Sequence, residues 1–275
     1  MKAIIISAVG TSLLTNFARA YNISTSKIFT EPSSEEEFLK FIKEKGLESC
    51  AEVSSICKIL DILEKDGIRK SEVGVFLISS DTREGKFCTI IIEKYFKLKG
   101  ISVKKETAKG LIYDSKEFIN RGLLTLVEIV SREVEYAKKM GCRVIINITP
   151  GFKPEIAYMT LIGILSSSEI YYIHERFREP IKIPPLPIKI DEETLKEYSE
   201  VLDYLREEKP LEEVERVFKE RLEKVKPLTV IKEKNGKKTI QLGPAGKTLH
   251  LMSQLEKKSI NEITRQKRMI ENNNS

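Results

Sequence analysis

Short, almost continuously apolar segments alternate with longer amphipathic segments over residues 1–175. Segments 2–9, 74–79 and 143–148 are apolar at nearly every position. This composition is typical of strands that are buried on both faces, whereas half-exposed strands alternate apolar and polar residues. The segments between them repeat apolar residues at the helical period of 3.6. The alternation predicts an α/β fold, in which a Rossmann-like parallel sheet carries helices on both faces.

The expected elements of this sheet follow from the same periodicity and from local capping residues. Asp114 or Ser115 is a suitable cap for the longest helix, because its side-chain oxygen accepts from free backbone N–H groups. We expect strands over 2–9, 74–79, 101–105, 143–148 and 169–174, and helices over 11–20, 35–45, 50–64, 85–99, 115–140 and 154–166.

The last hundred residues have a different pattern. Segment 180–187 is too rich in proline for a central strand and is expected to form an extended connector. Two helical patterns follow over 192–207 and 211–224, and Asn235-Gly236 between two apolar-polar runs predicts a hairpin. A helix from residue 244 to about 255 completes a winged-helix-like α+β module, and the end at 272–275 is expected to fray. We therefore expect a ligand-binding domain over 1–178, a linker over 179–190 and a module over 191–275.

Composition excludes several classes of protein. No segment reaches the roughly 20 apolar residues of a membrane helix, and the first strand begins at Lys2, which leaves no room for a secretory signal peptide. The four cysteines form no C-x-x-C pair, and with only two histidines in the sequence a Cys/His zinc site is not expected. Reduced cysteines are typical of a cytoplasmic protein. These residues are Cys50, Cys57, Cys88, Cys142, His174 and His250.

Positive charge is concentrated at the C-terminal end. The formal charge is +6, from 47 basic and 41 acidic residues. Residues 226–275 hold 11 basic and 4 acidic side chains, which leaves 36 basic and 37 acidic residues in the remainder. The basic end is interpreted either as a solvated surface or as a nucleic-acid contact of the C-terminal module.

Small and polar residues follow the predicted strands, where parallel sheets bind ligands. Gly10 allows close backbone approach, and Thr11 and Ser12 begin a helix whose free N–H groups face an anion. The simpler interpretation of this hydroxyl pair is a helix cap. Neither a Walker loop nor G-x-G-x-x-G is present, so a dinucleotide-dependent dehydrogenase has little support.

Two further loops carry candidate residues. After the second strand, Asp81 would either cap the next helix or bond a ribose or base edge. After the fourth strand, Gly151 permits a tight turn and Pro154 suits the start of a helix. Lys153 would lie at the positive end of that helix, which is locally unfavourable and therefore indicates function. An ordinary surface lysine is the alternative.

Three segments together resemble the CRISPR-associated Rossmann-fold (CARF) family. They read IIISAVGTSLLTN, SSDTREGKF and TPGFKPEIAY, in this order and each after a predicted strand. Within the family the chain is most similar to the ring nucleases of type III CRISPR systems. The family pattern usually has Gly-Gly-Phe-Lys, and here Pro150 replaces the first glycine and stiffens the loop.

The resemblance implies a homodimer that binds cyclic tetra-adenylate, a second messenger, at its two-fold axis. Cleavage would use the ligand's own 2′-hydroxyl and no metal or other cofactor, leaving a 2′,3′-cyclic phosphate and switching off the antiviral signal. Lys153 would supply the cation and Ser12 would orient the 2′-hydroxyl or the phosphate. No histidine accompanies these motifs, so turnover is expected to be slow. The implied ligand-binding residues are Gly10, Thr11, Asn16, Ser80, Asp81, Thr82, Gly151 and Phe152.

Other roles in the same family stay open. A ring that is sensed without cleavage would make the chain a transcription regulator or an effector ribonuclease subunit. The effectors carry an R-x(4–6)-H motif, and neither His174 nor His250 has an arginine at that spacing. The helices before the predicted hairpin are rich in glutamate, which opposes insertion into a DNA groove.

Overall fold

The computed structural model describes residues 1–30, 35–174, 177, 179–184, 186, 188 and 191–254. It divides into two compact units, Met1–Leu186 and Pro187–Ser275. None of the helices in the described ranges is long and apolar enough to cross a membrane.

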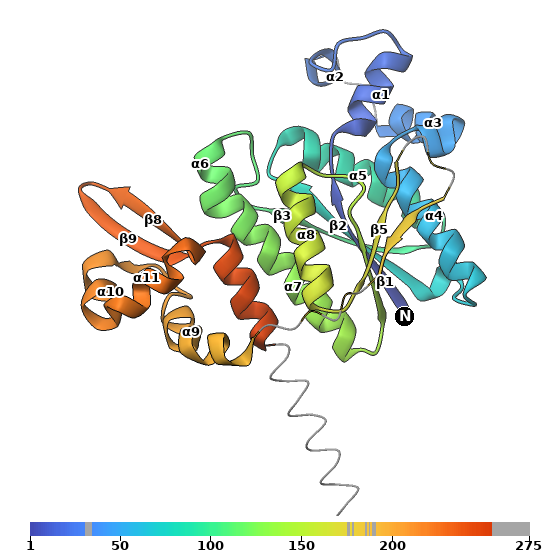
Figure 1. Ribbon diagram of the computed structural model, residues 1–275. Helices are drawn as coiled ribbons and strands as arrows, with labels where there is room; N and C mark the ends of the chain where they lie inside the picture. Colours follow the sequence, from blue (N-terminus) through green and yellow to red (C-terminus); the bar gives the residue numbers. More distant parts are fainter. Residues whose placement is uncertain are drawn as a thin grey trace, which may run out of the picture. The chain divides into compact units, whose positions relative to one another are not determined.

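The N-terminal unit is built on a six-stranded sheet in the order β3-β2-β1-β4-β5-β6 (Figure 1). The first five strands pair in parallel and β6 pairs with β5 antiparallel. β1 and β2 are buried along their whole lengths, as their continuous apolar composition requires. The expected α/β fold is confirmed. The strands are β1 (Ala3–Val9), β2 (Val73–Ser80), β3 (Ser102–Ala108), β4 (Arg143–Asn147), β5 (Glu169–Tyr172) and β6 (Ile181–Ile183).

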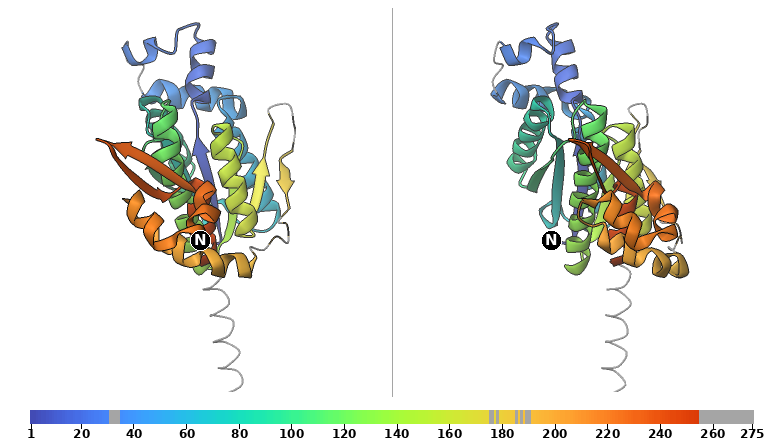
Figure 2. Two further views of the ribbon diagram at one scale, coloured as in Figure 1. Left: turned by 60° about the vertical axis from the view of Figure 1, so that its left-hand side comes forward. Right: turned by 90° about the vertical axis from the view of Figure 1, so that its left-hand side faces the viewer.

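Helices cover both faces of this sheet, and Figure 2 shows α5 and α7 on opposite sides of it. α4 and α5 pack on one face together with α1 and α3, whereas α7 and α8 pack on the other. Gly163 brings α8 close to Ile146 and Ile170, since a Cβ there would lie 2.6 Å from Ile170. The helices are α1 (Ser12–Ala20), α2 (Lys27–Thr30), α3 (Glu35–Lys45), α4 (Ala51–Lys65), α5 (Arg83–Leu98), α6 (Ser115–Glu117), α7 (Leu123–Lys139) and α8 (Lys153–Leu165), with short 3₁₀ turns at Gly46–Glu48 and Lys70–Glu72.

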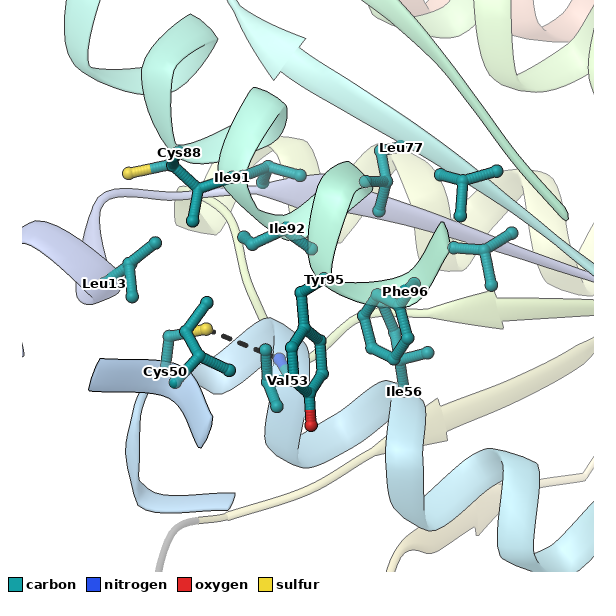
Figure 3. Close-up of a cluster of buried hydrophobic side chains, with 14 of the residues drawn as sticks. Leu13, Cys50, Val53, Ile56, Leu77, Cys88, Ile91, Ile92, Tyr95 and Phe96 are labelled. Atoms are coloured by element: carbon teal, nitrogen blue, oxygen red, sulfur yellow. Dashed lines mark hydrogen bonds between the residues drawn. The ribbon is translucent and has the colours of Figure 1, made fainter. Parts of the chain in front are cut away.

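The core beneath α4 and α5 is apolar and closely packed (Figure 3). Val53, Ile56, Ile91 and Phe96 are all fully buried there. Cys50 caps α4, because its Sγ accepts a hydrogen bond from Val53 N at 3.5 Å. Burial strongly raises the pKa of this thiol.

The segment expected as one helix over 115–140 is interrupted. α6 begins with Asp114 as its cap, whose Oδ1 accepts from Glu117 N at 2.8 Å. A π-helical turn, Phe118–Gly122, then separates α6 from α7. Gly122 lies against the loop after β3, since a Cβ on it would lie 2.6 Å from Gly110 O. Wide turns of this kind are frequently found at functional sites.

Strand β6 lies inside the segment 179–190 that the sequence analysis assigns to a linker. It is short, antiparallel and placed at the sheet edge, where proline neighbours are tolerated. The compact N-terminal unit accordingly extends to Leu186.

The C-terminal unit has the element order and sheet order of a winged helix. Its sheet runs β7-β9-β8, and the Asn235-Gly236 turn joins β8 and β9 as expected. The expected helix over 211–224 is instead two helices, because Lys219 has φ +44° and ends the first of them. A further helix covers residues 244–254, and residues 255–275 lie outside the described residues. The elements are α9 (Glu192–Tyr204), β7 (Lys209–Pro210), α10 (Leu211–Phe218), α11 (Glu220–Val225), a 3₁₀ turn (Lys226–Leu228), β8 (Thr229–Lys234) and β9 (Lys237–Leu242).

Candidate functional site

The topological switch point of the sheet lies between β1 and β4. The chain runs from β1 to β2 and β3 on one side of the sheet, then returns to β4 on the other side of β1. A pocket of about 280 Å³ opens at the carboxyl ends of these strands, and we call it the switch-point pocket. It is lined by Val9, Gly10, Thr11, Ser12, Ala51, Glu52, Ser80, Tyr113, Thr149, Pro150, Gly151, Phe152 and Glu155. Six residues that the sequence analysis selects are therefore brought together here.

Ser12 is fixed by the first turn of α4 and does not cap its own helix. Its Oγ donates to Glu52 Oε2 at 3.1 Å and accepts from Ala51 N at 3.1 Å. Gly10 N donates to the other oxygen of the same carboxylate, Oε1, at 2.8 Å. Thr11 occupies the cap position of α1 without a side-chain hydrogen bond to the helix, so the simple capping role is wrong for both hydroxyls.

Glu52 is fully buried and holds the loop after β1 in place. One carboxylate thus accepts from a backbone amide and from a side-chain hydroxyl of the same short segment. Charge-assisted hydrogen bonds of this kind are stronger than neutral ones. Glu52 could not be recognised from the sequence, because it lies 40 residues after Ser12 and belongs to no recognisable motif.

The loop after β4 approaches the loop after β1 closely. Gly151 has φ +117°, which an L residue rarely adopts, and a Cβ on Gly10 would lie 3.9 Å from Gly151 N. Thr149 anchors this loop, since its Oγ1 accepts from Ile173 N at 3.0 Å and its own amide donates to Asn147 Oδ1. A bulky side chain at either glycine would narrow the pocket.

A buried polar cluster supports the floor of the site. Asn147 is fully buried, and its Nδ2 donates to Ser7 Oγ at 3.0 Å and to Ser55 Oγ at 2.7 Å. These bonds join β4, β1 and α4 directly beneath the switch point. Satisfied buried networks specify one arrangement of the elements they connect.

Asp81 and Thr82, which follow β2, form hydrogen bonds that hold the loops after β2 and β3 and the start of α5 in place. Thr82 caps α5, because its Oγ1 accepts from Gly85 N at 3.0 Å, so the capping role considered for Asp81 belongs to its neighbour. Asp81 Oδ2 accepts from Gly110 N, and its other oxygen pairs with Lys86 at 2.6 Å. The hydrogen bond from Lys86 lowers the pKa of Asp81. Neither Asp81 nor Thr82 lines the switch-point pocket, whereas the buried Ser80 does.

Exposed aromatic rings lie at the pocket. Tyr113 is 69% exposed and makes an edge-on contact with Phe152, with ring centroids 5.5 Å apart. Phe118, from the π-helical turn, contacts the same Phe152 ring at 6.3 Å. Aromatic faces of this kind can stack on nucleobases. The sequence analysis selects Phe152 but not Tyr113.

Lys153 is exposed and is the first residue of α8. Among the residues that the structure describes, its side chain forms no ion pair or hydrogen bond. Its backbone follows Phe152 directly, so its long side chain starts beside the pocket without lining it. The free cation and the α8 N-terminus both favour a negative ligand.

A second pocket of about 600 Å³ adjoins the first, and the two share Ser12, Ala51 and Thr149. Asn16 lines it and donates to Ser49 O at 3.1 Å. Arg19, Lys45 and Lys58 also line it, and Glu48 is its acidic lining residue. The two pockets therefore lie on either side of shared lining residues, Ser12 among them.

Glu155 is the second buried carboxyl of the switch-point pocket and was not selected from the sequence as a site residue. It is 3% exposed, and burial raises its pKa to about 7, although a hydrogen bond from the backbone of Phe152 opposes this. Within the described ranges, no group of three or more His, Cys, Asp or Glu side chains is arranged to hold a metal ion.

The fold and the pocket define an α/β protein with a ligand site at its topological switch point. A family model described as CRISPR-associated protein (Cas_APE2256) matches residues 47–186, about half of the chain. The chain therefore belongs to this CRISPR-associated family, which is of the CARF type. The match includes Glu52, the loop after β4 and Glu155, whereas Gly10 and Ser12 precede it.

Proposed function

We propose that the protein is a ring nuclease that binds cyclic tetra-adenylate and cleaves it without a metal, by attack of the ligand's own 2′-hydroxyl. The observation that carries this proposal is that a fixed hydroxyl, that of Ser12, and the N-terminal cap of α8, Phe152, line one pocket. Such a reaction needs positioning of the nucleophile and stabilisation of charge on the phosphate. Membership of a CARF-type CRISPR family supports the choice of ligand.

Ser12 would position the reacting ribose. The Ser12 hydroxyl donates its proton to Glu52 and accepts from Ala51 N with one lone pair. Its second lone pair is left to accept a hydrogen bond from a 2′-hydroxyl. Because two hydrogen bonds hold the Ser12 side chain, it would reach the ligand in one fixed orientation. Rigid placement lowers the entropic barrier of an intramolecular attack.

Lys153 would neutralise charge that develops on the phosphate. Its ammonium group has no competing carboxylate among the described residues, and four-carbon stems let such a group reach into a neighbouring site. The N–H groups at the start of α8 would add to the same effect. Gly151 permits the close approach that these backbone groups require.

Binding by a homodimer is part of this proposal. A ring of four identical nucleotides has a two-fold axis, so each protomer would present the same patch to half of the ring. The exposed rings of Tyr113 and Phe152 beside the pocket suit coverage by the ligand or by a second protomer. Two adjoining pockets in each protomer would offer room for more than one nucleotide.

The direct test is incubation of the purified chain with radiolabelled cyclic tetra-adenylate in EDTA at raised temperature. Linear di- or tetra-adenylate is the expected product, and a dimeric mass in solution is expected for the complex. Tight binding with no product over several hours would make the chain a sensor of the ring and would refute the proposed cleavage.

A DNA-binding regulator is the second candidate, favoured by the winged-helix order β7-β9-β8. The ion pairs of α11, the helix in the recognition position, argue against DNA binding. Arg221 and Lys224 of α11 are paired with Glu200 and Glu197 of α9, so these cations are already neutralised. Salt-sensitive and sequence-specific binding to duplex DNA would support the regulator.

A further inference from the structure

Glu155 lines the switch-point pocket and is a buried acid with one unsatisfied oxygen. It is the third residue of α8 and is 3% exposed. Its Oε1 finds no hydrogen-bond partner among the residues that the structure describes. Its Oε2 lies under the turn at Gly151, where a Cβ would approach it to 2.9 Å. Buried polar atoms are normally paired, so an unpaired one on a residue that lines a pocket indicates a role toward a ligand.

The surroundings of Glu155 favour the protonated form. None of the described residues lining the pocket is Lys, Arg or His. The titratable groups that face it are Glu52 from α4 and Tyr113 from the loop after β3, and the charge of Lys153 on its own helix lies at the exposed surface. A buried carboxyl without a neighbouring cation keeps its proton to higher pH, and burial raises the pKa of Glu155 to about 7.

Two carboxyls with opposite surroundings therefore share one pocket. Glu52 accepts hydrogen bonds at both oxygens, from Gly10 N and Ser12 Oγ, so neither of its oxygens is left without a partner. Glu155 lacks a partner at Oε1, which leaves a carboxylic acid free to donate. In known enzymes, two acids held in different surroundings take different roles, and one of these roles is that of proton donor.

We propose that Glu155 is the proton donor to the 5′-oxygen that leaves when the ring is opened. The inference rests on the proposed function. In the step, the 2′-oxygen forms a bond to phosphorus while the bond from phosphorus to the 5′-oxygen breaks. The 5′-oxygen departs with the electron pair and takes the carboxyl proton of Glu155. The proton of the 2′-hydroxyl is released to water, and Glu155 regains a proton from water before the next turnover.

The experiment measures single-turnover cleavage of cyclic tetra-adenylate by the full chain between pH 5.5 and 9, with ligand affinity measured in parallel. The variants are Glu155→Gln and, as a matched control, Glu133→Gln. Glu133 on α7 is also buried, at 7% exposed, and its Oε1 is also without a partner in the described structure, but it does not line the pocket. A second substrate replaces each bridging 5′-oxygen by sulfur, a leaving group that needs no proton.

The proposal predicts that Glu155→Gln slows cleavage of the oxygen substrate by about 100-fold with affinity within threefold, whereas Glu133→Gln cleaves like the wild type. The ratio of wild-type to Glu155→Gln rates is expected to fall tenfold per pH unit above about pH 7, where Glu155 loses its proton. With the sulfur substrate the variant is expected to recover the wild-type rate. Equal impairment on both substrates, or no impairment on either, would overturn the proton-donor role.

Two outcomes separate this inference from the function on which it rests. Cleavage by the wild type with an unimpaired Glu155→Gln variant would leave the ring nuclease standing and remove the proton donor. Absence of wild-type cleavage on both substrates would overturn both. If Glu155→Gln fails to fold, the wild type alone tests the proposal. Its cleavage rate on the oxygen substrate must then fall above pH 7, and its rate on the sulfur substrate must not.

Discussion

The Ser12 hydroxyl donates to Glu52 Oε2 at 3.1 Å, and this bond joins the loop after β1 to the first turn of α4. It fixes a side chain that would otherwise rotate freely at a helix start. The same carboxylate accepts from Gly10 N, so Glu52 sets both the backbone and the hydroxyl of the segment that faces the pocket. Ser12 and Glu52 are therefore a single positioning unit.

Ser12→Ala is expected to lower the cleavage rate by about 100-fold while ring affinity changes little, because it removes one positioning group from the reacting ribose. Thr15→Ala is the matched control. Thr15 lies on the same helix and is exposed, and its hydroxyl bonds only to Thr11 O among the described contacts. Single-turnover rates and equilibrium binding would distinguish the two effects, and equal rates for Ser12→Ala and wild type would remove Ser12 from the site.

Lys153→Ala is expected to reduce the rate by about 100-fold or more, because it removes the cation that opposes charge on the phosphate. Lys153→Arg should restore part of the activity, since it keeps the charge with a different shape. Lys40→Ala, at an exposed position of α3, serves as the control for loss of a surface charge. A Lys153→Ala variant that cleaves as fast as Lys40→Ala would show that the site does not require this charge.

Glu52→Gln is expected to destabilise the N-terminal unit by about 1–3 kcal/mol and to abolish most cleavage. The amide keeps one accepting oxygen but presents an NH₂ group to Gly10 N or Ser12 Oγ, where an acceptor is needed. Urea unfolding followed by far-UV circular dichroism gives the stability, and labelled ring gives the rate. Full activity in this variant would contradict the claim that Glu52 positions Ser12 and Gly10.

Gly151→Ala is expected to cost about 1–3 kcal/mol of stability, because an L residue at φ +117° is strained. The added Cβ would also lie 2.9 Å from Glu155 Oε2 and displace that carboxyl. Gly141→Ala, at φ +67° with open space around its Cβ position, separates strain of the backbone from crowding of the site. Ring affinity should fall only for Gly151→Ala.

Glu155→Gln is expected to stabilise the protein at pH 8 and to have little effect near pH 4.5. Burial raises the pKa of Glu155 from its ordinary 4.5 to about 7, so the folded chain holds this proton at pH values where the unfolded chain has lost it. Stability is therefore full below about pH 4.5, falls as pH rises to about 7, and stays reduced above that pH. The pKa shift corresponds to a loss of about 3 kcal/mol of folding stability at most. Glutamine avoids this loss because its side chain carries no charge. Chemical unfolding at the two pH values measures the difference, and a variant less stable than wild type at pH 8 would argue against a buried acid.

Much of the N-terminal fold could be predicted because apolar runs and helix caps are local signals. The helix at Glu35–Lys45 was placed within its actual bounds, and β1 within one residue. The π-helical turn at Phe118–Gly122 and the break at Lys219 could not be predicted, since amphipathic periodicity continues through both. β6 is three residues long and depends on an antiparallel partner, β5, for its existence.

Some residues of the candidate site could likewise be predicted from the sequence, and others could not. Gly10, Ser12 and Gly151 follow strands and carry loop signals, so the sequence places them at one edge of the sheet. Glu52 and Glu155 occupy first turns of helices, where glutamate is ordinary, and only the tertiary fold shows that both are buried in one pocket. A single sequence does not distinguish these glutamates from the many on its surface.

Analysis of the ends left on the products of cyclic tetra-adenylate, cleaved by the wild-type chain in EDTA, tests the central claim most directly. Attack by the ligand's own 2′-hydroxyl predicts a 5′-hydroxyl at one end and a 2′,3′-cyclic phosphate at the other, identifiable by mass spectrometry and by resistance of the labelled phosphate to phosphatase. A 5′-phosphate end, or an intact ring after prolonged incubation with tightly bound protein, would contradict the account.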